Sequence, residues 1–206
     1  MHYILWLTLL LLPPHCQVHK PYIDSEIPEP IIDVIDTVRY EPPQINTMAH
    51  VEYMRLHIGV PPRDTINMWL ASVGLPPNNP FCSAALSHSL DVAGVASPSV
   101  RSGLARNFVY QTPKAIQISA KDVFRGMATV PAGSIVVYQR GETIFGHNGF
   151  VTAEFTGEGS VYISANTSAP GSQGSESAGG GVYEKPFRIN PYSYFRVTDF
   201  VLVSYD

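Results

Sequence analysis

The sequence predicts an α+β protein, with helices in the first half packed on an antiparallel β-sheet of about five to six strands. Between residues 46 and 94, apolar residues recur at helical spacing and are bounded by capping residues and glycines. After residue 130, short β-rich segments alternate with turn residues. Helices that precede strands, instead of alternating with them, favour α+β over a doubly wound sheet.

Length, charge and composition indicate a single turn-rich globular domain that is not a nucleic-acid binder. A chain of 206 residues is long enough for one domain with a real core. Its net charge of −4 disfavours nucleic-acid binding, which normally needs a basic face. The 18 prolines and 16 glycines indicate many turns.

The N-terminus resembles an export signal. The apolar run 4–12 is too short to span a bilayer and is ended by Pro13. We therefore expect a signal-peptide-like segment at 1–16, export to the periplasm, cell envelope or exterior, and no stable membrane span after processing. No basic residue precedes the run and no small-x-small site follows it, so a lipid anchor at Cys16 or a short apolar tail stay open.

A proline-rich, acidic tether is expected at 17–45, followed by a domain at 46–206. Its first helix should run through "MAHVEYMRLHIG", and a second should begin with Asp64 as its cap and end before Gly74. In "NNPFCSAALSHSLDVAG", Asn79 is expected to cap a third helix, which places Cys82 at its third position and Gly94 at its end.

The second half supplies the sheet. The segments with strand character are "SIVVYQR", "HNGFVTAEF", "SVYISAN", "GVYEKPFRI" and "DFVLVSY". The stretch "APGSQGSESAGGG" at 169–181 is a flexible loop between two of them. Residues 102–109 and 120–124 are plausible short helices or loops.

Cys82 is the first candidate for chemistry. The first turn of a helix lowers the pKa of a thiol through its unpaired N–H groups, and the same groups can stabilise an oxyanion. The competing interpretation is a small buried residue that only packs. A nucleophilic role needs an imidazole close by.

His147 is the best-placed histidine. It stands in "GHNGF" at the start of a predicted strand, where two glycines permit close approach. His88 follows Cys82 by six residues, which turns it roughly 120° away around the helix. Asn166 ends the next predicted strand, and an antiparallel pairing would set it beside His147 to orient the ring. Asn166 could equally be a turn residue.

The segments "PFCSAAL", "PAGSIVVYQRG", "GHNGFV", "YISANTS" and "GGGVYEKPFR" together resemble the cysteine, histidine-dependent amidohydrolases/peptidases, the CHAP family. The similarity covers about residues 46–204. It implies a papain-like fold and cleavage of amide bonds in peptidoglycan peptides, by an endopeptidase or an N-acetylmuramoyl-L-alanine amidase. It also implies Cys82 as nucleophile, His147 as general base and then acid, and Asn166 as the orienting residue.

The sequence departs from the family at three positions. Ser164 stands where many members have an acid, Phe81 where a tryptophan is common, and Asn148 where an apolar residue is common. The loop "GLPPNNP" holds no carboxylate, so we expect neither a metal nor a cofactor. Peptidoglycan peptide is the expected substrate, and a monomer is the default. The alternatives are a catalytically inactive wall-binding or interaction module on the same scaffold, and an amidase toxin.

Overall fold

The predicted α+β class is confirmed by the computed structural model, which describes residues 48–172 and 180–205. The expected leader at 1–16, the tether at 17–45 and most of the loop at 169–181 lie outside the described residues. The helices are α1 (Ala49–Arg55), α2 (Arg63–Ser72), α3 (Cys82–Val92), α4 (Asn107–Tyr110), a 3₁₀ turn (Lys114–Ile116) and α5 (Ala120–Phe124). The strands are β1 (Gln117–Ser119), β2 (Ile135–Arg140), β3 (Gly146–Val151), β4 (Gly159–Thr167), β5 (Gly181–Arg188) and β6 (Phe195–Val201).

The strands form one antiparallel sheet of six strands in the order β1-β6-β2-β3-β4-β5. Four predicted strands occur close to their expected places. The fifth was expected at 199–205 but forms at Phe195–Val201, because the chain after it leaves the ladder and Ser204 pairs with Ser97 instead. The short strand β1 was not predicted.

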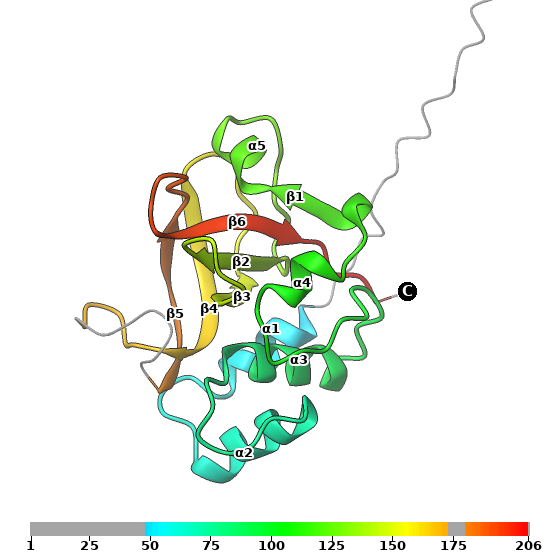
Figure 1. Cartoon of the computed structure of the whole chain (residues 1–206), viewed down its shortest axis with the longest axis vertical. Coiled ribbons are helices and arrows are strands. Elements are labelled where there is room, and N and C mark those ends of the chain that lie inside the picture. Colours follow the sequence, from blue (N-terminus) through cyan, green and yellow to red (C-terminus); the bar gives the residue numbers. More distant parts are fainter. Residues whose placement is uncertain (1–47, 173–179, 206) are drawn as a thin grey trace, which may run out of the picture. The chain divides into compact units, whose positions relative to one another are not determined.

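Apolar side chains cover both faces of the sheet. On one face, α1 and α3 cover a core that includes Ile135, Val137 and Phe150, and α2 packs on α3 (Figure 1). On the other face, α5 and the aromatic residues of β4, β5 and β6 pack against Val136 and Val151. We call these the α3 face and the α5 face. Because both are buried, a polar side chain on β3 finds no solvent on either side.

The amino ends of α2 and α3 differ from expectation. Asp64 does not cap α2, which begins one residue earlier at Arg63. Asn79 does not cap α3: its side-chain amide donates instead to the carbonyl of Pro76 at 2.9 Å. The helix starts at Cys82, after Phe81 with φ −113° and ψ 10°. Cys82 is therefore the first residue of α3, not the third position of the helix.

The C-terminal segment is fastened to α1. The buried ring of His50 contacts the hydroxyl of Tyr205 through Nδ1, and its Nε2 donates to the carbonyl of Gly133 at 2.8 Å. With Nε2 carrying the proton, Nδ1 accepts from Tyr205. Burial lowers the pKa of His50 to about 4, so the ring is neutral at pH 7.

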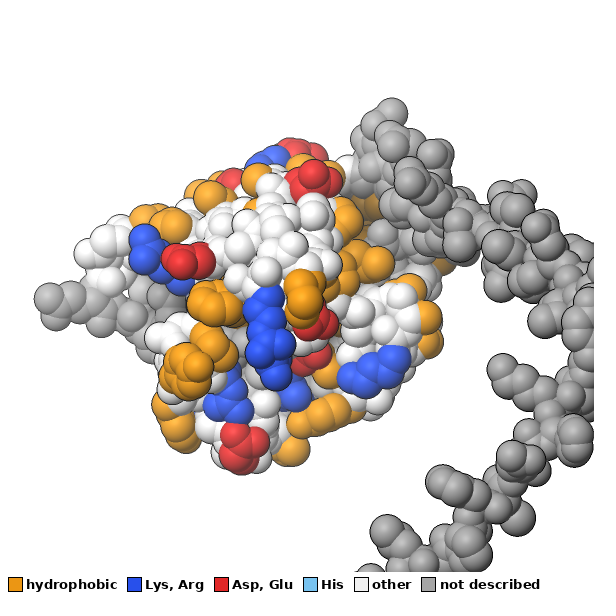
Figure 2. Space-filling view, turned by 90° about the horizontal axis from the view of Figure 1, so that it is seen from above, with side chains coloured by type: hydrophobic (Ala, Val, Ile, Leu, Met, Phe, Trp, Pro, Cys, Tyr) orange, Lys and Arg blue, Asp and Glu red, His pale blue; other side chains and the backbone are white. Residues whose placement is uncertain are grey.

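Two features of the described residues bear on partners. No helix among them has the length and hydropathy needed to cross a bilayer. On the face seen in Figure 2, basic side chains stand in separate groups among apolar and acidic ones. That face therefore offers no continuous basic surface of the kind that nucleic-acid backbones require.

Candidate active site around Cys82

Cys82 lies at the amino end of α3, and its sulfur lies 3.9 Å from the hydroxyl oxygen of Ser83. No side chain caps this end of the helix, and Cys82 as a residue is only 6% exposed. Burial raises its pKa, while the Ser83 hydroxyl and the backbone N–H groups of Ser83, Asn148 and Cys82 itself act in the opposite direction. Burial is the larger effect, so the sulfur stays protonated at neutral pH in this arrangement.

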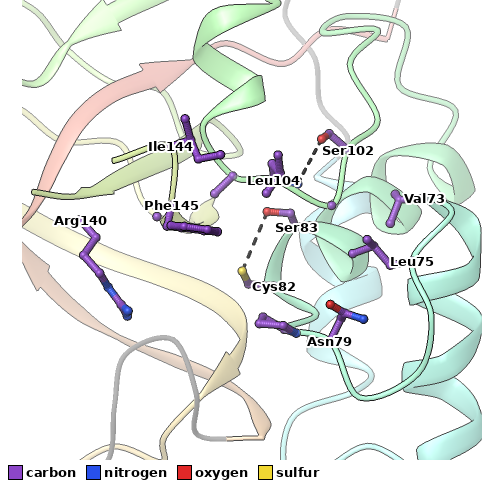
Figure 3. Close-up of a pocket in the computed structure, with 14 residues that line it drawn as sticks. Val73, Leu75, Asn79, Cys82, Ser83, Ser102, Leu104, Arg140, Ile144 and Phe145 are labelled. Carbon is purple, nitrogen blue, oxygen red and sulfur yellow. Dashed lines mark hydrogen bonds between the residues drawn. The ribbon is translucent and has the colours of Figure 1, made fainter. Parts of the chain in front are cut away.

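A cavity of about 550 Å³ opens beside the thiol. Its walls come from the amino end of α3, the segment after α2, the loop at 102–105 and the turn between β2 and β3 (Figure 3). The lining residues are Val73, Leu75, Asn79, Pro80, Cys82, Ser83, Ser102, Gly103, Leu104, Ala105, Arg140, Ile144, Phe145 and Gly146. A volume of this size is typical of small-molecule and short-peptide sites.

Asn166 lies on the other side of the same helix end. It lines a second cavity of about 370 Å³ that shares Asn79 and Pro80 with the first and also contains Phe81. Its backbone adopts φ 56°, and the register of β4 against β5 shifts at this residue. The structure thus brings Asn166 to the amino end of α3, as a buried residue of an irregular strand.

His147 points away from Cys82. Along β3 the side chains alternate between the two faces, and Phe150 belongs to the α3 face while Val151 belongs to the α5 face. His147 is therefore on the α5 face. Its ring centroid lies 5.9 Å from that of Tyr138 and 6.3 Å from that of Tyr162, both on that face. The structure does not bring the imidazole to the thiol.

The surroundings of His147 keep it neutral. Its side chain is fully buried, and neither ring nitrogen has a hydrogen-bond partner. Burial, assisted by the positive charge of Lys185, lowers the pKa of His147 to about 3. Ser164 alternates onto the same face from β4, and its hydroxyl is also buried without a partner. On folding, these polar groups lose their hydrogen bonds to water and form no hydrogen bond within the protein in their place, which costs stability.

Asn148 takes the place expected for the imidazole. It alternates onto the α3 face, paired with Val137 on β2, and its backbone N–H acts to lower the pKa of the Cys82 thiol. Its side chain is fully buried, and both polar atoms of its amide lack a hydrogen-bond partner. Sequence reasoning treated Asn148 only as a departure from the family. Its alternation with Phe150 was the available signal.

Neither His88 nor His50 lines the cavity beside Cys82. His88 is half-buried on α3, with its ring 5.6 Å from that of Tyr53. His50 is engaged by Tyr205 and Gly133. Within the described part of the chain, no group of three or more His, Cys, Asp and Glu side chains is placed to hold a metal ion.

Comparison with protein-family models, curated proteins and solved structures finds no match to this chain.

Proposed function

We propose that the protein is a cysteine amidohydrolase that cleaves amide bonds of peptidoglycan peptides, with Cys82 as nucleophile. The observation that carries the proposal is the position of Cys82, which begins a helix and lines a cavity, where the backbone N–H groups of Ser83, Asn148 and Cys82 itself act to lower the pKa of its thiol. These donors stabilise negative charge, first on the thiolate and then on the oxyanion of the attacked carbonyl. The resemblance to the CHAP family supplies the substrate class.

The reaction needs a proton acceptor. The sulfur of Cys82 bonds to the amide carbon as its proton passes to a base, and that base then protonates the departing amine. A thioester remains, and water attacks it with the same base accepting a proton. The products are a carboxylic acid and an amine, and the thiol is restored. His147 is proposed as the base and Asn166 as the residue that orients it.

For this role His147 has to reach the α3 face. The first half of β3 is held by β2 alone, because its pairing with β4 begins at Phe150. A slip of the whole strand is unfavourable in either direction, since it would carry a Cβ into the place of Gly149 or Gly146. A Cβ at position 149 would lie 2.4 Å from the carbonyl oxygen of Ile163, and a Cβ at position 146 would lie 1.9 Å from that of Tyr138. The proposal therefore requires a local bulge in β3 that turns the side chain of His147 to the α3 face and that of Asn148 to the α5 face.

A second candidate is a wall-binding module without turnover. The orientation of His147 and the raised pKa of Cys82 favour it, because both describe a thiol that is not activated. It predicts that the protein sediments with peptidoglycan but releases no fragments, and that replacing Cys82 changes neither result.

The deciding experiment measures fragments released from purified peptidoglycan by the full chain, with mass spectrometry to identify the bond. Cys82→Ala should abolish release, and His147→Ala should reduce the rate at least about a hundredfold. The matched control is His88→Ala, which removes a histidine from α3 outside the cavity and should keep the rate within about twofold. Full activity of Cys82→Ala would refute the proposal.

A further inference from the structure

The cavity beside Cys82 has a strongly uneven charge distribution. Its walls are largely apolar, made by Val73, Leu75, Leu104, Ala105, Ile144 and Phe145. Arg140 is the one charged residue among those that line it, and no carboxylate does. Arg140 is exposed at the rim of the cavity, so solvent and salt screen its charge, and it favours an anionic group over a neutral one of the same shape.

Arg140 is held on rigid structure. It ends β2, its backbone pairs with Phe195 of β6, and its N–H donates to the carbonyl of Phe145 at 3.0 Å. Figure 3 shows the side chains of Arg140 and Cys82 on opposite sides of the cavity, with Phe145 between them. A ligand that is bound at the guanidinium and extends toward the sulfur therefore lies against the Phe145 ring.

The nearest carboxylate of the same turn is engaged elsewhere. Glu142 pairs with Arg196 at 2.6 Å and does not line the cavity. Arg140 takes part in a further interaction of its own. A guanidinium has five N–H donors in a planar fork, so it can keep an existing acceptor and still bind a carboxylate.

We propose that Arg140 selects acidic ligands for this cavity, by binding a carboxylate of a short peptide whose small apolar groups lie against the neighbouring walls. The inference rests on the proposed function for the peptide nature of the ligand. The inference adds to the proposed function the residue that sets specificity and the charge that this residue selects.

The first test uses the charge of a thiol reagent. Iodoacetate and iodoacetamide form the same carbon–sulfur bond and release iodide, but only iodoacetate is anionic. All proteins carry Cys16→Ser, which leaves Cys82 as the one thiol of the chain. The iodoacetate-to-iodoacetamide rate ratio, measured by mass spectrometry at pH 9, should fall about threefold in Arg140→Gln.

The matched control is Arg125→Gln, which removes the same charge from an exposed site outside the cavity and should leave the ratio unchanged. The selectivity should also shrink as salt is added, which a purely structural effect would not produce. Equal ratios in the parent and Arg140→Gln would overturn the proposal. So would a thiol that reacts with neither reagent, since no ligand could then reach this wall.

The second test measures binding in Cys82→Ala, where cleavage is absent. N-acetyl-Ala-Glu should bind about tenfold more tightly than N-acetyl-Ala-Gln, and Arg140→Gln should remove the difference. Equal affinity for the two peptides in the parent would overturn the inference. Charge selectivity without any peptidoglycan cleavage would refute the proposed function alone, whereas cleavage without acidic preference would refute this inference alone.

Discussion

His147 and Asn148 stand on opposite faces of β3, and it is Asn148 that shares a face with the helix of Cys82. Each is fully buried, and each has polar side-chain atoms without a partner. On each face of β3, one of these two adjacent residues thus buries polar atoms without a hydrogen bond, which is unfavourable. An exchange of the two side chains would bring the imidazole toward the thiol.

This arrangement predicts that an apolar residue at 147 stabilises the fold. Phenylalanine in place of His147 would lie among the rings of Tyr138, Tyr162 and Phe195 and has no ring nitrogen to leave unpaired. His147→Phe should raise the free energy of unfolding by about 1–2 kcal/mol. Urea unfolding at pH 7 measures it, with His88→Phe as the half-buried control. A loss of stability would show that the imidazole makes favourable contacts.

The reactivity of the thiol should report which side of β3 the imidazole occupies. With His147 on the α5 face, burial dominates and the pKa of Cys82 lies above the usual thiol range. In the free protein the rate of iodoacetamide modification should therefore rise to a midpoint above pH 9, and His147→Ala should not move it. A midpoint below pH 8 that His147→Ala abolishes would instead reveal a thiolate–imidazolium pair before substrate binds.

The protein should lose stability in mild acid because two buried histidines are neutral in the fold. Folding lowers the pKa of His50 from 6.5 to about 4 and that of His147 to about 3. The unfolded chain therefore binds more protons below pH 6.5, and stability falls as the pH drops from there toward 4. At pH 5 each histidine should cost about 2 kcal/mol relative to pH 7.

Urea midpoints at pH 7, 6 and 5 provide the measurement for this acid effect. His147→Phe removes one of the two groups, so its loss between pH 7 and pH 5 should be about half that of the parent. A midpoint that stays constant over this range would contradict the buried, neutral state of both rings.

The fold class was predictable because local signals agreed with one another. Apolar residues at helical spacing define α1–α3, and "SIVVYQR" and "GVYEKPFRI" fall on β2 and β5. The start of α3 was not predictable from residue type. Asn79 is a favourable cap, but its amide bonds back to Pro76 within the turn, so the helix begins later.

The face of His147 could not be obtained from the sequence either. Alternation identifies a buried face only when the opposite face is polar. In β3 both Phe150 and Val151 are buried, on opposite sides, so the apolar pattern fits either orientation. Only the pairing of Tyr138 with His147 and of Val137 with Asn148 distinguishes them, and this register depends on the length of the β2–β3 turn.

The contact between Tyr205 and His50 joins the segment after β6 to α1, the first described helix. Backbone amides of α1 and of the segment near Ser204 should therefore exchange their hydrogens with solvent deuterium at comparable rates, since neither opens without the other. Removing the final two residues should therefore reduce the hydrogen-exchange protection of the α1 backbone amides before that of other helices.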